Sequence, residues 1–178
     1  QQEGSEEAAD ILARYITDQD AKVAARALYA LGRMDDPRHA EAIKKTLTDD
    51  RATLREAAVY ALAKSSGRKD SKPVVEVLQA DQSPSVRAAA ATALGQAHAW
   101  DSMPNLVAAL RDPDVQVRRN AINSIIRMIG IDPLYRADDP PAKREAAIRK
   151  IESIWPTMAD AHAKYLERIG RDPKQQGR

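Results

Sequence analysis

An internal repeat of about 31 residues constrains the fold of this chain more than any other feature. An aspartate recurs at intervals of 31, 32 and 31 residues, as Asp18, Asp49, Asp81 and Asp112. The stretch Asp81–Gly95 shows the pattern most completely, as D-Q-S-P-S-V-R-A-A-A-A-T-A-L-G. A fixed period of this size is typical of stacked repeat architectures, in which each unit contacts only its neighbours.

Each repeat carries similar residues at fixed distances from its aspartate. Five residues on stands an apolar residue, and four further on an alanine: Val23 and Ala27, Leu54 and Ala58, Val86 and Ala90, Val117 and Ala121. A small residue and an apolar one follow: Ala30 and Leu31, Ala61 and Leu62, Ala93 and Leu94, Ser124 and Ile125. This spacing predicts a helix with one buried face, which we call helix A.

A second helix, helix B, follows in each repeat. In the first repeat we expect helix A over about 21–31, ending at Gly32, and helix B over about 38–47. The helix B core positions recur at the same offsets: Ile43 and Leu47, Val74 and Leu78, Leu106 and Leu110. The sequence therefore predicts an all-α protein, a right-handed α-solenoid (an αα-superhelix) of about four helix pairs with capping helices.

The predicted boundaries follow from the same pattern. Residues 1–5 offer nothing to bury and are expected to be disordered, and a capping helix is expected from Glu6 to Ile16. The single solenoid domain is expected to span 6–170, with repeats at about 18–48, 49–80, 81–111 and 112–155, a separate terminal helix at 157–169 after Pro156, and a flexible tail at 171–178.

The recurrent aspartate precedes helix A, where a carboxylate can accept the free N–H groups of the first turn. Three repeats carry an arginine directly after the first apolar residue of helix A: Arg55, Arg87 and Arg118. One interpretation is a row of anion-binding guanidinium groups. We favour a structural ladder, in which each arginine reaches the loop aspartate of a neighbouring repeat, because arginine–carboxylate forks suit fixed geometry.

The pattern D-x4-V-R-x2-A-x2-A-L-G resembles the short HEAT-like repeat of the phycobilisome-lyase type, as found in bacterial-type scaffold domains. The resemblance covers about Asp18 to Ile129. It implies an armadillo-like superhelix. Such repeats occur in chromophore lyases, in some alkylpurine DNA glycosylases and above all in protein-binding scaffolds, so the resemblance specifies fold more than function.

The fourth repeat departs from the pattern because the spacing between its helices is 11 residues longer than in the other repeats, and the extra residues fall in the loop 130–141. Insertions in solenoids map to loops on one face, often the binding face. Tyr135 and Arg136 are therefore candidate contact residues. The acidic residues Asp132, Asp138 and Asp139 are either cation ligands or, as we favour, a cap for the helix that follows.

The expected partner surface is the concave face, which the B helices line in this architecture. Its predicted outward line, mixed in charge and more apolar toward the third repeat, comprises Glu41, Lys45, Lys72, Glu76, Gln79, Ala108 and Arg111. A mixed rim around an apolar patch suits a protein partner, whereas nucleic acid needs a continuous basic stripe. We therefore expect a protein-binding scaffold that uses this face together with the 130–141 loop.

Composition and motifs favour a non-enzyme without cofactor or metal. There is no cysteine, and the three histidines occupy non-equivalent repeat positions without metal-ligand spacing. Two alternatives remain open. One is nucleic-acid binding of the glycosylase type through the basic C-terminal part, where residues 111–178 carry a charge of +4: Arg118, Arg119, Arg127, Arg136 and Arg144. The other is chromophore handling of the bilin-lyase type.

The sequence does not decide the compartment or the oligomeric state. No apolar run is long enough to span a membrane, so a soluble protein is expected. It would be cytoplasmic, or extracytoplasmic if a leader preceded Gln1.

Overall fold

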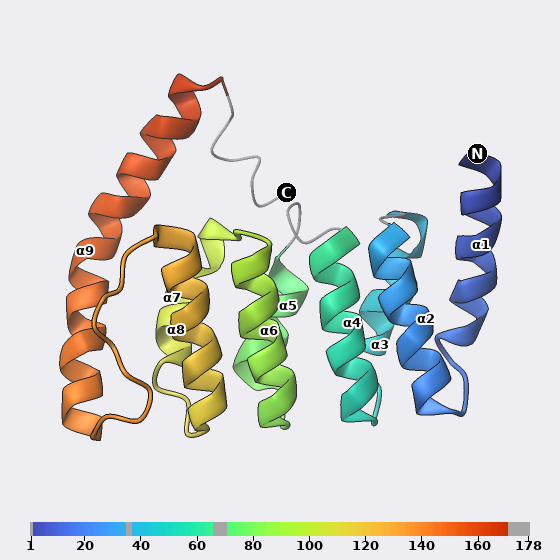
Figure 1. The fold of residues 1–178 in the computed structure, drawn as a ribbon, viewed down its shortest axis with the longest axis horizontal. Coiled ribbons are helices and arrows are strands. Elements are labelled where there is room, and N and C mark those ends of the chain that lie inside the picture. The colour runs from blue at the N-terminus through green and yellow to red at the C-terminus, as the bar shows by residue number, and fades with distance from the viewer. Residues whose placement is uncertain (1, 35–36, 66–70, 171–178) are drawn as a thin grey trace.

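The computed structural model describes residues 2–34, 37–65 and 71–170, and over these residues the chain is a stack of helices without strands (Figure 1). The helices are α1 (Gln2–Tyr15), α2 (Ala21–Met34), α3 (Ala40–Thr46), α4 (Ala52–Ser65), α5 (Lys72–Ala80), α6 (Pro84–Gln96), α7 (Met103–Ala109), α8 (Val115–Ile129) and α9 (Pro141–Arg168). Short 3-10 turns, Pro37–His39 and Trp100–Ser102, precede α3 and α7. The predicted all-α solenoid is confirmed.

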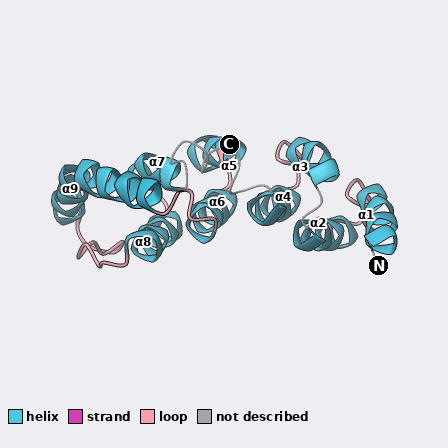
Figure 2. Cartoon of the chain, turned by 90° about the horizontal axis from the view of Figure 1, so that it is seen from above, coloured by secondary structure: helices cyan, strands magenta, loops and turns pink. Residues whose placement is uncertain are grey.

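The helices form two layers (Figure 2). The A helices α2, α4, α6 and α8 make one row, which we call the A layer, and the B helices α3, α5 and α7 make the other, the B layer. Helix α1 lies at one end of the stack and α9 at the other (Figure 1). The predicted tail at 171–178 lies outside the described residues, as do residues 1, 35–36 and 66–70.

The core follows the repeat pattern, with one exception in the first repeat. Leu54, Val86 and Val117 are fully buried between the layers. Val23, their counterpart, is 38% exposed, and Ala24 is buried in its place. The first repeat is the end of the A layer, so no preceding A helix covers its outer side. The prediction that Val23 belongs to the core was therefore wrong.

Two glycines lie inside A helices and set how closely the helices approach. A Cβ on Gly32 would lie 2.5 Å from Ala61 Cα, and one on Gly95 would lie 2.3 Å from Ser124 Oγ. Gly32 was expected to end helix A, but α2 continues to Met34 because the glycine serves packing. The expected left-handed end occurs in the fourth repeat, where Gly130 ends α8 with φ 72°.

The A layer is therefore tightly packed, whereas the B layer is open. A groove of about 690 Å³ separates α3 from α5, with Leu47, Pro73 and Val77 among its lining residues. In a curved stack the more widely spaced layer lies outside. Figure 2 shows both rows arched, with their ends displaced toward the A side. The B layer is thus on the outer side of the curve, which contradicts the expectation that the B helices line a concave face.

Helix α1 packs against α2 at the open end of the stack (Figure 2). Ala9 and Ile16 are buried against the stack, while Ile11 and Tyr15 are each 47% exposed. Its carboxylate Asp10 lies 3.1 Å from His39 Nε2 and so links α1 to the first repeat. The helix begins at Gln2, within the segment 1–5 for which we had expected disorder.

The C-terminal cap is one long helix, not the two that Pro156 led us to expect. Proline removes one backbone donor from a helix but bends it without necessarily ending it, and Figure 1 shows α9 changing direction along its length. Trp100 fixes the upper part of α9 by stacking on His162, with ring centroids 3.8 Å apart. It also stacks on Trp155 at 5.7 Å.

The close approach of the A helices predicts that Gly95→Ala destabilises the protein. Alanine is intrinsically the better helix former by about 1 kcal/mol, but the overpacking against Ser124 should cost about 1–3 kcal/mol more than that gain. Urea unfolding followed by circular dichroism measures the difference. Gln96→Ala, at the exposed neighbouring position, is the control and should stay within about 0.5 kcal/mol of wild type. An unchanged or raised midpoint for Gly95→Ala would contradict the account.

Candidate functional site

Two buried ion pairs join consecutive repeats. Arg55 donates from Nε and Nη2 to both carboxylate oxygens of Asp81, at 2.7 and 2.8 Å. Arg87 makes the same fork with Asp112, at 2.8 and 3.0 Å. Both partners of the first pair have side chains only 6% exposed, and the second pair is 12% and 10% exposed. Each fork fixes the loop of one repeat onto the first turn of the preceding A helix.

The remaining donors and acceptors of each pair are also satisfied. Arg55 Nη1 donates to the carbonyls of Asp49 and Asp50 in the loop before its own helix. Asp81 Oδ1 accepts the backbone N–H of Ser83, two residues on. The recurrent aspartates therefore close a turn before helix A. We had expected them to cap the first turn of the helix, and they do not. At α8 the capping residue is Asp114, which accepts from Gln116 N and Val117 N.

The two ends of this ladder are completed differently. The first repeat has Ala24 at the arginine position, so Arg51 bonds Asp49 with Nε and Nη2 and reaches the Asp18 carbonyl with Nη1. In the last repeat Arg118 has no following aspartate and donates from Nε and Nη2 to the carbonyl of Ala137 instead, at 3.0 and 2.8 Å. The insertion thus ends the ladder.

The ladder shifts the pKa values of its members. Burial alone would raise the pKa of Asp81, but the fork with Arg55 and the N–H of Ser83 outweigh burial and hold it below the ordinary value of 3.8. Asp49 also has a lowered pKa, chiefly because of its hydrogen bonds from Arg51. The same charge-assisted bonds raise the pKa of Arg55.

The insertion loop is held by contacts to the preceding elements and by one ion pair of its own. Tyr135 is 1% exposed and its hydroxyl donates to the Leu110 carbonyl at 2.7 Å, so it belongs to the core. The prediction that Tyr135 contacts a partner was therefore wrong. Arg136 is exposed but donates to Asp132 at 3.0 and 3.1 Å. Asp138 pairs with Arg119 at 2.8 Å.

The acidic residues of the loop neither cap α9 nor gather into a metal site. The capping position is Pro140, without a side-chain bond, and Asp139 instead pairs with Lys143 at 3.1 Å. Among the described residues no group of three or more acids, histidines or cysteines is placed to hold a metal ion.

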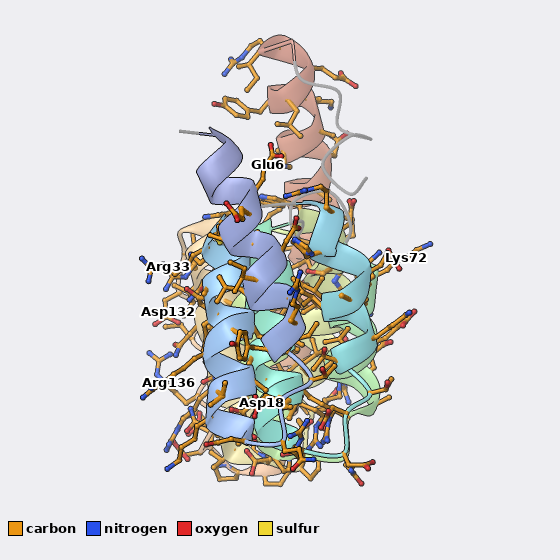
Figure 3. The ribbon with its side chains drawn as sticks, turned by 90° about the vertical axis from the view of Figure 1, so that its right-hand side faces the viewer. Glu6, Asp18, Arg33, Lys72, Asp132 and Arg136 are labelled. Atoms are coloured by element: carbon orange, nitrogen blue, oxygen red, sulfur yellow. The ribbon has the colours of Figure 1, made fainter. Side chains whose placement is uncertain are left out.

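The predicted partner residues fall on two different sides of the molecule. Glu41, Lys45, Lys72, Glu76, Gln79 and Ala108 are exposed on the B layer. Figure 3 shows Lys72 on one side and Arg136, with Asp132, on the opposite side together with Arg33 of α2. The 130–141 loop therefore extends the A-layer side and cannot form one continuous face with the B-layer residues.

Arg111, the last predicted partner residue, is already engaged. It donates to both oxygens of Glu145 at 2.9 and 2.8 Å and to Glu152 at 2.8 Å, and so anchors α9 to the end of α7. Its charge is matched within the fold, and reversing it would disturb the C-terminal cap.

The A layer carries an aromatic hollow that sequence reasoning missed. Tyr29 of α2 and Tyr60 of α4 meet edge to face, with ring centroids 5.1 Å apart. They border a cavity of about 200 Å³ that spans α2, α4 and α6, and its other lining residues are Glu56, Val59, Ala89, Thr92, Ala93 and Gln96. Tyr29 is 40% exposed at its edge. Both tyrosines stand eleven residues after a recurrent aspartate, so aligning the repeats by their outward positions would have revealed the pair.

The hollow combines an apolar floor with a polar rim, a combination that is common in protein-binding surfaces. Its floor is apolar, because Val59 and Ala93 are buried, and its rim has amide, hydroxyl and carboxylate groups. Partial burial, helped by the nearby Glu56 carboxylate, raises the pKa of Tyr29 above its ordinary value of 10.0. Exposed tyrosines of this kind are enriched among the residues that dominate protein–protein interfaces.

A family model supports this architecture. The model of HEAT repeats matches residues 2–63 and 71–150. The chain belongs to the HEAT-repeat family. HEAT repeats are generally protein-interaction scaffolds, and the family is typically non-enzymatic. A search of curated proteins gives no significant match to this chain.

Among the described residues of this HEAT-repeat protein, no helix is both long enough and apolar enough to cross a membrane.

The buried ladder predicts a large cost for Asp81→Asn. The amide leaves the Arg55 guanidinium without its counter-charge in a site that is almost fully buried, which should lower the free energy of unfolding by about 3 kcal/mol. Asp138→Asn is the control, since it breaks the exposed pair with Arg119 and should cost at most about 1 kcal/mol. Equal costs for the two variants in urea unfolding would contradict the structural role of the ladder.

The lowered pKa of Asp81 also predicts how stability depends on pH. The folded-state pKa lies below the unfolded value of 3.8, so the carboxylate stabilises the fold fully above that value. The contribution is lost as the pH falls from about 4 through the folded-state pKa. We expect the free energy of unfolding to decline with acidification over this range, and less steeply in Asp81→Asn. Parallel pH profiles for the two proteins would contradict this assignment.

Proposed function

We propose that this HEAT-repeat protein is a scaffold that binds a protein partner on the A-layer face, with the tyrosine hollow as its anchor point. The observation that supports the proposal most is the edge-to-face pair of the exposed Tyr29 and the half-buried Tyr60 above an apolar floor. An aromatic anchor with a polar rim is the usual centre of a protein interface.

Two further features support this face over the B layer. The A layer lies on the inner side of the curve, where an extended partner meets several repeats at once (Figure 2). The 130–141 loop lies on the same side as the outward face of α2 and lengthens this surface (Figure 3). That the exposed B-layer residues form a second contact surface stays a prediction.

The nucleic-acid alternative has less support, because the arginines that motivated it are mostly engaged. Arg118 is buried and donates hydrogen bonds to backbone carbonyls. Arg119 and Arg136 pair with aspartates. Arg144 donates to the Asp139 carbonyl. A continuous row of available cations, which phosphate binding requires, does not form from this set.

The test is a capture experiment on a native extract with matched tyrosine variants. We expect Tyr29→Ala to reduce recovery of the specific partner by about tenfold or more, because truncating an interface anchor typically costs about 2 kcal/mol or more. Tyr15→Ala removes an equally exposed tyrosine from α1, outside the hollow, and should recover the partner as wild type does.

A second variant separates the two layers. Lys45→Glu with Lys72→Glu reverses charge on the B layer and should leave recovery unchanged. Loss of the partner in this double variant, with full recovery by Tyr29→Ala, would contradict the A-layer proposal. Thermal melts of each variant exclude unfolding as the cause of a loss.

A further inference from the structure

A row of mostly cationic side chains runs along the carboxyl ends of the A helices. Fifteen residues after each recurrent aspartate stand Arg33, Lys64, Gln96 and Arg127. All four are exposed. Because they occupy the same position in successive repeats, they lie along one edge of the A-layer face. Figure 3 shows Arg33 projecting outward on this side.

Within the part of the chain that the structure describes, no carboxylate pairs with Arg33 or Arg127 of this row. Lys64 lies over the Tyr60 ring, with Nζ 5.9 Å from its centroid, which joins the row to the tyrosine hollow. By contrast, the neighbouring cations Arg119 and Arg136 each have an aspartate partner.

The helix dipole explains why cations are tolerated at Arg33, Lys64 and Arg127, since the last turn of a helix favours positive charge. It does not neutralise the charge that faces solvent. The row therefore places positive charge beside the apolar tyrosine hollow. A ligand that complements both features carries acidic groups and an apolar side chain.

We propose that the partner segment bound on the A-layer face is an acidic stretch of a protein, with one apolar side chain in the tyrosine hollow and carboxylates on Arg33 and Lys64. This inference rests on the proposed function and specifies the chemistry of the partner. Neighbouring helices pack about 8–10 Å apart, and an extended chain advances about 3.3 Å per residue. Carboxylates at about every third residue would therefore match adjacent repeats.

A protein segment fits this row better than nucleic acid does. Gln96 interrupts the cations in the third repeat, and the parallel row eleven residues after each aspartate is neutral: Tyr29, Tyr60, Thr92 and Asn123. A phosphate backbone carries charge at every step and gains most from an unbroken basic stripe. An acidic segment needs cations only where its carboxylates fall.

The experiment measures binding of a synthetic probe by fluorescence anisotropy. The probe is a labelled peptide of about ten residues, with glutamate at about every third position and one leucine. A matched peptide carries glutamine for each glutamate, and an oligo(dT) of equal net charge represents nucleic acid. We expect the acidic peptide to bind more tightly than either.

Charge reversal locates the contact. Arg33→Glu with Lys64→Glu should weaken binding of the acidic peptide by about tenfold or more, because the double variant removes two ion pairs and replaces them with repulsion. Lys45→Glu with Lys72→Glu makes the same change in net charge on the B layer and should alter affinity less than about threefold, through long-range electrostatics alone.

Three results would overturn the inference: equal binding of the glutamine peptide, equal loss in both double variants, or tighter binding of oligo(dT). Its failure is distinguishable from failure of the proposed function. If the native partner is lost by Tyr29→Ala but retained by the Arg33/Lys64 variant, the scaffold proposal stands and the acidic-segment inference falls.

Discussion

Two buried arginines, Arg55 and Arg87, each bridge the loops of consecutive repeats, and the register of the stack depends on these bridges. Arg55 and Arg87 each satisfy a carboxylate of the following repeat and a carbonyl of their own loop with one rigid guanidinium group. A planar fork with fixed donor directions tolerates little sliding between neighbours. The small residues along the A helices then allow the close contact that the bridge enforces, as Gly95 against Ser124 shows.

The repeat pattern made most of the fold predictable, because periodic Asp, Arg and Ala positions encode contacts between neighbouring units. Its errors lie where a residue has two possible uses. Gly32 is of a residue type that often ends helices, yet here it allows close helix packing and α2 continues past it. Pro156 is of a residue type that often marks a helix boundary, yet α9 continues through it. Val23 follows the core pattern but lies where the stack has no outer neighbour.

The candidate site was harder to predict, because function depends on which side of the stack each element takes. The 11-residue insertion could be recognised from the spacing of the repeats. That spacing does not reveal that Tyr135 turns inward and donates to the Leu110 carbonyl. Nor does periodicity reveal that Arg111 is used to hold α9. The outward positions of the A helices do recur in the sequence. Tyr29 and Tyr60 were not predicted because we expected the B helices to line the concave face. The tightly packed A layer lies on the inner side of the curve instead.

The central claim is that ligands meet this protein on its A layer. Chemical-shift mapping of the isotope-labelled protein during titration with the acidic peptide tests it most directly. The account predicts shifts in the backbone amides of the outward positions of α2, α4 and α6, centred on Tyr29, Tyr60 and Lys64. Shifts confined to α3, α5 and α7 would place the binding surface on the B layer and contradict the account.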